Sequence, residues 1–473
     1  MKKQLFFDDN LLFGIENVER KYGEPKIIST YNDGISSTDF CTGYVFRLDN
    51  GKFRMLYFGA SKSFNGKKFF SAISEDGVNF EPEQIFDLTE HPDKEFSHEI
   101  MSISGVSEVA TVFEDEYCTD KNERYKLLMT EQQVGEYSIS DVVYVSSDLI
   151  SWTKKEGSFW ADGAEPIAGA FYNKRKRCYT VVERPFWGVR VVGYKETLDW
   201  VNFSEFRYCV NVDALDGRLD EIYGMTAFEY EGNYVGLVHL YRGLESEYNA
   251  KYCNGIIDTQ IAYSSDGRFW TRSLREPFIS GVNSKEGETE YKITWITSLR
   301  KGDDGSIYLY GSASELEHGP AFVNPGTGKI LVRRLREDGF IKLVNEDISR
   351  PSSIITREKM WRSGELHVNL KAESATVAVY VSEEEKALTS NLIGYAMQIE
   401  GMGHQDCIAF SGDSTDWVPQ FESGKKISDY IGKTLVIEIK WQKGELYSLA
   451  GDYVDLFNTQ GARYRRLGVL PND

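Results

Sequence analysis

A short pattern that recurs along the chain constrains its fold most. A hydroxyl side chain is followed two residues later by Asp and six residues later by an aromatic side chain, as in Ser74, Asp76 and Phe80. In such a pattern the Asp carboxylate folds onto backbone amides of a tight turn, and the ring fixes the turn to a sheet. The copies occupy residues 74–80, 146–152, 197–203 and 264–270, with a degraded fifth at 336–340. Copies in register predict a repeated supersecondary unit.

Two strand-like runs precede each copy of the turn. A short polar connection joins each pair, such as residues 48–51 before the first copy, and this favours a hairpin. The runs are residues 41–47 and 52–58, 109–113 and 125–130, 167–172 and 178–182, 223–230 and 234–241, and 293–299 and 307–311. Five hairpins, each followed by the turn element, predict a five-bladed β-propeller over residues 1–350.

The pattern changes after residue 350. Alternating strands at 365–370, 376–381, 435–441 and 446–448 lack the Asp turn and predict a separate β-sandwich over residues 351–473. Aromatic residues make up 14% of the chain and 11 residues are Pro, a balance that favours strands. The expected fold class is therefore all-β, with a five-bladed β-propeller followed by a C-terminal β-sandwich.

The charge and the N-terminus limit the partners and the compartment. Lys and Arg total 54 against 73 Asp and Glu, a formal charge of −19 that argues against nucleic acid as a partner. The N-terminus turns acidic at Asp8, and no segment reaches the roughly 18 apolar residues of a membrane helix. We therefore expect a cytoplasmic protein with no membrane contact; a homo-oligomer is compatible with the sequence.

Several motifs resemble those of a known superfamily. The repeated S-x-D-x-x-x-W element, five blades and an appended sandwich resemble glycoside hydrolase families 32, 43 and 68, the fructosidases and arabinanases. The likeness is greatest to uncharacterised bacterial family-32-like proteins, and it is carried by residues 4–8, 183–190, 275–278, 335–340, 365–369 and 446–448. The W-x-N-D-P-N, R-D-P and E-C strings of family 32 itself are missing. The resemblance implies a furanosidase-like or fructosidase-like hydrolase of small oligosaccharides or glycosides, acting at the propeller's central pocket.

Acidic residues precede the first strand of each predicted blade. In a propeller these strands begin near the axis, so their acids would meet around one mouth. A ring of carboxylates has divergent proton affinities, and it supplies the protonated and the ionised carboxyl groups that glycoside cleavage requires. The candidates are Asp39, Glu99, Glu108, Glu165, Asp220, Glu221 and Glu290.

The resemblance also implies a role for acids on three blades. Asp39 matches the nucleophile or base. A second-blade acid, Glu99 or Glu108, would orient Asp39 and tune its proton affinity. Glu165 stands in an E-P context similar to the proton donor of family 43. Asp220 or Glu221 competes for that last role, because their stretch begins an inner strand in the same way. The catalytic candidates are Asp39, Glu108, Glu165 and Glu221.

Further side chains are expected to hold the sugar. Aromatic faces stack against a sugar ring, while Arg and His donate to its hydroxyls. The predicted substrate-binding residues are Glu99, Arg184, Trp187, Arg190, Asp220, Tyr223, His239, Arg242 and His318. No cofactor or catalytic metal is expected, because the six His are dispersed along the chain. A structural Ca²⁺ in the acidic channel is compatible with the composition.

Other functions fit the same sequence. A propeller can bind carbohydrate without catalysis, since a fold alone does not imply chemistry. A glycoside phosphorylase or transglycosylase would use the same scaffold and the same acids. A purely structural or protein-interaction propeller is a further alternative, and its mouth would be occluded or would lack paired carboxylates.

Overall fold

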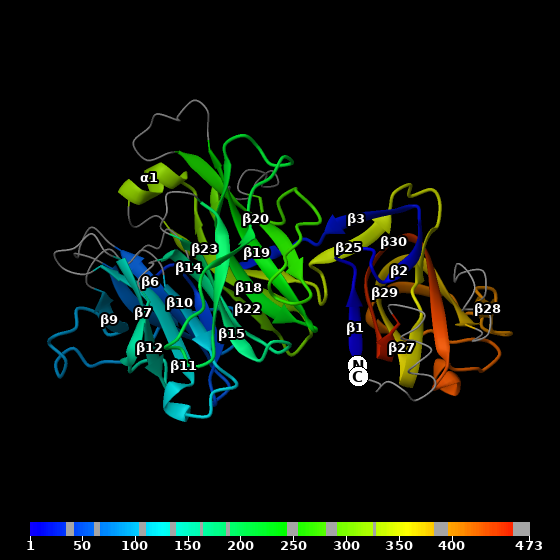
Figure 1. Cartoon of the computed structure of the whole chain (residues 1–473), viewed down its shortest axis with the longest axis horizontal. Helices are drawn as coiled ribbons and strands as arrows, with labels where there is room; N and C mark the ends of the chain where they lie inside the picture. The colour runs from blue at the N-terminus through cyan, green and yellow to red at the C-terminus, as the bar shows by residue number, and fades with distance from the viewer. Residues whose placement is uncertain are drawn as a thin grey trace. The chain divides into compact units, whose positions relative to one another are not determined.

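The computed structural model describes residues 1–34, 42–60, 67–103, 110–132, 139–160, 164–185, 190–243, 254–280, 291–324, 328–382 and 396–456. Figure 1 shows strands in every part of the chain, beside the short helix α1 (His318–Val323). The chain divides into two compact units. We name residues 24–336 the repeat unit, and residues 1–23 with 337–473 the terminal unit. Within the described ranges, no helix has the length and apolar character needed to cross a bilayer.

Three antiparallel sheets follow one another along the repeat unit, and consecutive strands pair in each. The first sheet holds β5 (Tyr44–Arg47), β6 (Phe53–Ala60), β7 (Lys67–Ser74) and β8 (Glu81–Pro82), with β9 (Glu99–Ile103) beside β7. The second holds β10 (Ala110–Glu114), β11 (Tyr125–Gln132), β12 (Ile139–Ser146) and β13 (Thr153–Trp160). The third holds β14 (Ala164–Asn173), β15 (Cys178–Pro185), β16 (Val192–Thr197) and β17 (Arg207–Val210).

An eight-stranded sheet completes the repeat unit. Its strands are β18 (Asp220–Tyr230), β19 (Asn233–Gly243), β20 (Gly255–Ser264), β21 (Ile293–Thr294), β22 (Ser298–Lys301), β23 (Ile307–Ser314), β24 (Lys329–Leu335) and β4 (Lys26–Tyr31). Strand β4 opens the unit and pairs with β24, which ends it, so that Tyr31 lies opposite Ile330. The five predicted hairpins are confirmed as β5–β6, β10–β11, β14–β15, β18–β19 and β22–β23.

The four complete copies of the repeated pattern form the predicted turn. In the third copy, the Asp199 carboxylate accepts hydrogen bonds from the backbone N–H groups of Val201 (2.9 Å) and Asn202 (2.8 Å). The residue after the Asp has a positive φ in each copy, for example 72° at Gly77 and 61° at Trp200. The local hydrogen bonds to the carboxylate therefore hold even a bulky residue in the left-handed region.

The turns also tie neighbouring sheets together. Arg54 of the first sheet donates to the Asp148 carbonyl in the second sheet's turn (2.7 Å), and Asn173 of the third donates to the Asp266 carbonyl in the fourth copy (2.7 Å). The Tyr310 hydroxyl on β23 donates to the carbonyl of Gly77, in the first sheet's turn (2.9 Å). The last hairpin of the repeat unit is thus bonded to its first sheet.

The degraded fifth copy differs from the other four in the contacts of its Asp. Its Asp338 belongs to the terminal unit, where the buried carboxylate accepts from Lys3 (3.0 Å) and Ser448 (2.6 Å). Residues 337–340 still form a turn, and Asp338 itself has a positive φ of 58°. In the complete copies the positive φ falls on the residue after the Asp. Here Arg336 stands in the place of the hydroxyl residue, and the turn has a different geometry.

The terminal unit contains one nine-stranded sheet. Its strands are β1 (Lys2–Leu5), β2 (Leu12–Glu16), β3 (Val18–Tyr22), β25 (Ile341–Asn345), β26 (Ser352–Thr356), β27 (Lys359–Ser382), β28 (Ala396–Gln398), β29 (Phe410–Trp417) and β30 (Thr434–Asp455). Strand β1 pairs with β30, β2 with β26 and β3 with β25. The predicted division at residue 350 therefore differs from the structural one, because residues 1–23 and 337–350 complete this sheet.

Candidate active site

Strands β14 and β18 begin at the same end of the repeat unit. Gly169 of β14 lies against Thr226 of β18, and Lys174, directly after β14, pairs with Glu229 near the end of β18, so the two strands run in the same direction. Strands β15 and β19 return antiparallel to β14 and β18, so Arg184 and Arg242 come back to this end, with Arg242 opposite Asp220. We name it the start end, and several predicted site residues on these strands meet there.

Arg190 links a carboxylate and two aromatic rings at the start end. Its guanidinium forms an ion pair with Glu221 at 2.5 Å, and its Cζ lies 5.2 Å from the Tyr223 ring centre and 4.9 Å from that of Tyr241. Burial alone would lower the pKa of Arg190, but its hydrogen bond and charge attraction to Glu221 outweigh burial and raise it. The Glu221 side chain is 38% exposed, so this fixed pair faces solvent.

Asp220 is held between its own loop and an arginine. It accepts from the Gly217 backbone N–H (2.8 Å) and forms an ion pair with Arg242 at 3.0 Å. Arg242 also contacts Asp258 at 2.5 Å. Both Asp side chains are nearly buried, and a buried carboxylate requires this kind of compensation. Asp220 and Arg242 therefore brace the rim of the site, and Arg242 keeps a part-exposed edge.

Tyr223 lies at the centre of this region. Its hydroxyl is 2.9 Å from Nε2 of His318, the first residue of α1. The Arg184 guanidinium lies 4.8 Å from its ring centre, a cation–π contact, and the Trp295 ring meets it edge-on at 5.7 Å. We name Arg184, Arg190, Glu221, Tyr223, Tyr241 and His318 the Tyr223 cluster. Sequence reasoning found all of them except Tyr241.

His239 differs from the prediction that it binds sugar. It is 0% exposed, its Nε2 accepts from the Ile296 backbone N–H (3.1 Å), and its ring stacks on Trp295 at 3.8 Å. Burial lowers its pKa well below the usual value, so the ring is neutral. In this conformation His239 supports the floor of the Tyr223 cluster and offers no surface to a ligand.

Glu99 also differs from a ligand-facing acid. It is buried, and it accepts from Lys68 (2.7 Å), Ser102 (2.8 Å) and the Glu95 backbone N–H (3.2 Å). Burial alone would raise its pKa, yet the hydrogen bonds and the Lys68 charge lower it. The carboxylate is therefore ionised and fully engaged by protein groups, as in a structural ion pair.

Sequence reasoning missed a buried acid near β4. The Asp33 side chain is 0% exposed; it accepts from the Tyr57 hydroxyl (2.8 Å) and lies 3.6 Å from Nε2 of His98. The Tyr31 hydroxyl is 3.0 Å from that of Tyr57. Burial and the negative charge of Asp33 raise the pKa of Tyr57 well above its usual value. Because Asp33 follows a strand in an Asn-Asp-Gly run, its sequence predicts only a turn.

The remaining candidates lie wholly or partly outside the described residues. Asp39, Glu108, Trp187 and Glu290 lie outside the described residues. Glu165 is the second residue of β14, which brings its backbone to the start end, but its side chain is not among those described. The meeting of acids from several sheets around one axis therefore stays a prediction.

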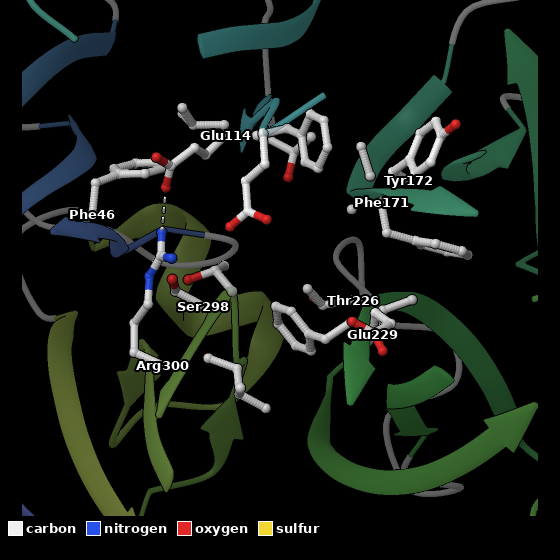
Figure 2. A pocket seen from close by; sticks show the side chains of 18 of the residues that line it. Phe46, Glu114, Phe171, Tyr172, Thr226, Glu229, Ser298 and Arg300 are labelled. Carbon is white, nitrogen blue, oxygen red and sulfur yellow. Dashed lines mark hydrogen bonds and ion pairs between the residues drawn. The ribbon is translucent and has the colours of Figure 1, made fainter. Parts of the chain in front are cut away.

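A cavity of about 230 Å³ lies along the later parts of the inner strands. Figure 2 shows Phe46, Glu114, Phe171, Tyr172, Thr226, Glu229, Ser298 and Arg300 around it. These residues come from β5, β10, β14, β18 and β22, the first strands of the five hairpins. Five segments far apart in sequence thus converge on one cavity, which we name the axial cavity. Nothing in the local sequence marks it, because it exists only through that convergence.

The described residues include no group of three or more His, Cys, Asp or Glu side chains arranged to hold a metal ion. Most acids of the Tyr223 cluster and of the axial cavity are instead paired with Arg or Lys, as in Glu221 with Arg190 and Glu114 with Arg300. Such sites suit hydrogen bonding to neutral polar groups.

Comparison with known proteins gives matches in structure only. No protein-family model matches the sequence, and no curated protein matches it. A thermostable family-43 glycoside hydrolase is 11% identical with a TM-score of 0.46, and the match covers 68% of this chain and 95% of that one. A glycosyl hydrolase from Bacteroides ovatus is 16% identical with a TM-score of 0.42, over 66% and 94% of the two chains.

A third structure belongs to the GH130 family of mannoside phosphorylases, described as containing glycoside hydrolases that target β-1,2 mannosidic linkages in Candida mannan. It is 16% identical with a TM-score of 0.39, over 66% of this chain and 94% of that chain. At these identities and scores the likeness assigns no role to any residue here.

Proposed function

We propose that this chain is a glycoside hydrolase that acts on a small oligosaccharide or glycoside, with furanosidase-like or fructosidase-like chemistry. The observation that supports this most is the Tyr223 cluster. It combines a part-exposed carboxylate, Glu221, with an aromatic ring and the Arg190 guanidinium at the start of an inner strand. Aromatic rings and hydrogen-bonding side chains around a carboxylate are the groups that hold a sugar ring for cleavage.

The architecture that goes with this function is a five-bladed propeller followed by a sandwich. The convergence of five first strands on the axial cavity supports five blades. So does the bond from Tyr310 to Gly77, since a ring must join its last blade to its first. The nine-stranded sheet of the terminal unit supports a sandwich, because strands as long as β27 and β30 can pass from one layer to another.

In the proposed reaction, Glu165 protonates the glycosidic oxygen as the bond to the anomeric carbon breaks. Asp39 attacks that carbon, or removes a proton from the water that does so. Glu108 orients and tunes Asp39, because Glu99 is already engaged by Lys68. Glu221 is already engaged by Arg190 in an ion pair at 2.5 Å, so we assign the role of proton donor to Glu165. Glu221 serves instead to hold Arg190 against the sugar.

The reaction would use no cofactor. Arg190 and Arg242, whose side chains are part-exposed, would contact the substrate, and the buried Tyr223, Arg184 and His318 would support them from below. A cytoplasmic location would expose the enzyme to sugars already taken up by the cell. Assembly into a homo-oligomer is compatible with this role and is not required by it.

The test compares turnover across aryl glycosides, including furanosides and fructosides, in the wild type and four variants. We expect Asp39→Asn, Glu165→Gln and Glu221→Gln to lower kcat/KM by at least about 100-fold, the usual contribution of a general acid or base or of its fixed partner. Glu229→Gln is the matched control, because Glu229 lies at the other end of β18. The proposal fails if the wild type turns over a substrate and the first two variants stay within a few-fold of it.

A second candidate is a propeller that binds carbohydrate without cleaving it. One observation favours it: both acids at the start of β18 are ion-paired, Asp220 with Arg242 and Glu221 with Arg190. Saturable binding of a glycoside panel without turnover would support this candidate. Turnover that requires inorganic phosphate would instead identify a phosphorylase.

A further inference from the structure

The axial cavity is separate from the Tyr223 cluster. On β18, Glu221 stands at the start end, whereas Thr226 and Glu229 line the cavity. A strand rises about 3.3 Å per residue, so Glu229 is roughly 25 Å along β18 from Glu221. A ligand bound among Glu229 and its neighbours therefore has its own contacts, and the proposed reaction makes no use of them.

The size of the cavity limits what it can hold. At about 230 Å³ it is several times the roughly 30 Å³ that one water occupies in the liquid. It is smaller than the roughly 300–1,000 Å³ of pockets that take drug-sized ligands. A single small ring with its substituents matches this volume.

Aromatic rings form part of the cavity wall. Tyr117 and Tyr172 stack with ring centres 4.0 Å apart and an angle of 23° between their planes, and Figure 2 shows Phe171 beside Tyr172. Phe46 and Phe228 also line the cavity. Aromatic faces of this kind favour a ligand with an apolar C–H face, as a sugar ring has.

The charges at the cavity are largely compensated. Arg300 pairs with Glu114 at 3.4 Å, and Lys174 pairs with Glu229 at 3.0 Å. Glu116 is exposed at the rim and has no ion pair or hydrogen bond to the described residues. The three acids outnumber the two bases, Arg300 and Lys174, and therefore disfavour an anionic ligand. The positive charges of the same two bases disfavour a cationic one. Hydroxyl groups can donate to Glu116 and accept from Lys174 without either penalty.

We infer that the axial cavity is a second carbohydrate site, which binds one neutral monosaccharide at the end of the repeat unit opposite the Tyr223 cluster. The ring lies against Tyr117 and Tyr172, and its hydroxyls bind Glu116 and the ion pairs. Binding at this site involves no turnover, so the inference can be tested independently of the proposed hydrolase activity.

The test is equilibrium binding, by ligand-observed NMR and calorimetry, of free glucose, galactose, mannose, xylose, arabinose and fructose to the full chain. The Arg190→Ala variant removes the main contact of the Tyr223 cluster, and we expect at least one sugar still to bind it. In that background Tyr117→Ala should weaken binding at least about tenfold, which corresponds to about 1.4 kcal/mol. Tyr208→Ala is the control, because Tyr208 is an exposed tyrosine on β17 away from the cavity.

Tyr117 is 45% exposed, so the substitution is compatible with folding, and an unchanged Tm verifies it. Glu116→Leu, which removes a carboxylate with no described partner, is the second variant and should weaken the same sugar. The inference is overturned if no sugar of the panel binds the Arg190→Ala protein. It is also overturned if both rim variants bind as tightly as Tyr208→Ala. Loss of turnover in Arg190→Ala together with retained sugar binding would separate the two sites.

Discussion

The Tyr310 hydroxyl donates to the carbonyl of Gly77 at 2.9 Å, across 233 positions of the sequence. Tyr310 lies in the last hairpin of the repeat unit, and Gly77 in the turn that follows the first. Both residues are buried. The same kind of bond joins the first and second sheets through Arg54, and the third sheet to the fourth copy of the turn through Asn173. A local turn element therefore supplies the long-range bonds between sheets.

We predict that Tyr310→Phe destabilises the chain by about 1–2 kcal/mol. The ring and its packing remain, while the Gly77 carbonyl loses its donor inside the protein. Tyr308→Phe is the matched control: Tyr308 is two residues away on β23, and its hydroxyl has no hydrogen bond to the described residues. Denaturant unfolding measures both. Equal stability of the two variants would contradict a structural role for the bond.

The turn carboxylates should make the chain acid-sensitive. Hydrogen bonds from the Asn202 and Val201 backbone lower the pKa of Asp199 to about 2, against about 3.9 in an unfolded chain. A group with a lowered folded pKa stabilises the fold above its unfolded value, and this stabilisation is lost as the pH falls from about 4 to 2. We expect the Tm of the Asp199→Asn variant to fall less than that of the wild type between about pH 4 and pH 2. Glu205→Gln, on an exposed side chain nearby, should follow the wild type.

The sequence predicted what depends on neighbours in the chain. The Asp turns could be predicted because every bond to Asp199 comes from within three residues of it. The five hairpins could be predicted for the same reason. The pairing of β1 with β30, as in Lys2 opposite Gly451, has no local signal, and this is why the unit boundary at residue 350 differs from the structure.

The site could be predicted only in part, for a related reason. Arg190, Glu221 and Tyr223 were found because each stands near a strand end and carries a useful group. His239 was misjudged because β19 is buried on both faces, so alternation along the strand could not tell an inward side chain from one facing the mouth. Asp33 was missed because a short Asn-Asp-Gly run predicts a turn whether or not its carboxylate becomes buried.

His239 should remain neutral at every pH at which the chain is folded. Its Nε2 accepts from the Ile296 N–H, so a proton added there would face another donor. Because burial holds its folded pKa far below the unfolded value of about 6.5, its contribution to stability is complete above pH 6.5. It declines below that pH by up to about 1.4 kcal/mol per pH unit. An imidazole NMR shift that stays constant from pH 8 to 5 would verify this, and a titrating shift would contradict it.

A buried ion pair in the terminal unit leads to a prediction about a buried charge. Lys359 and Asp455 are both buried and 2.5 Å apart, and half-exposed Lys2 also contacts Asp455, at 2.7 Å. Burial lowers the pKa of Lys359 to about 8, although Asp455 opposes this. Asp455→Asn leaves the Lys359 ammonium buried without a carboxylate and should cost about 3–5 kcal/mol. Lys2→Ala removes only an exposed partner and should cost less than about 1 kcal/mol.

The same pair should make stability rise with pH in the alkaline range. Between about pH 8 and the unfolded pKa of about 10.4, the folded chain has released the Lys359 proton while the unfolded chain still holds it. Raising the pH through this range therefore favours the fold, and urea titrations at pH 8 and pH 9.5 measure the gain. Lys359→Met should remove the gain, because no proton is then linked to burial at this position. A variant that gains as much as the wild type would show that other groups, such as the tyrosines, cause the change.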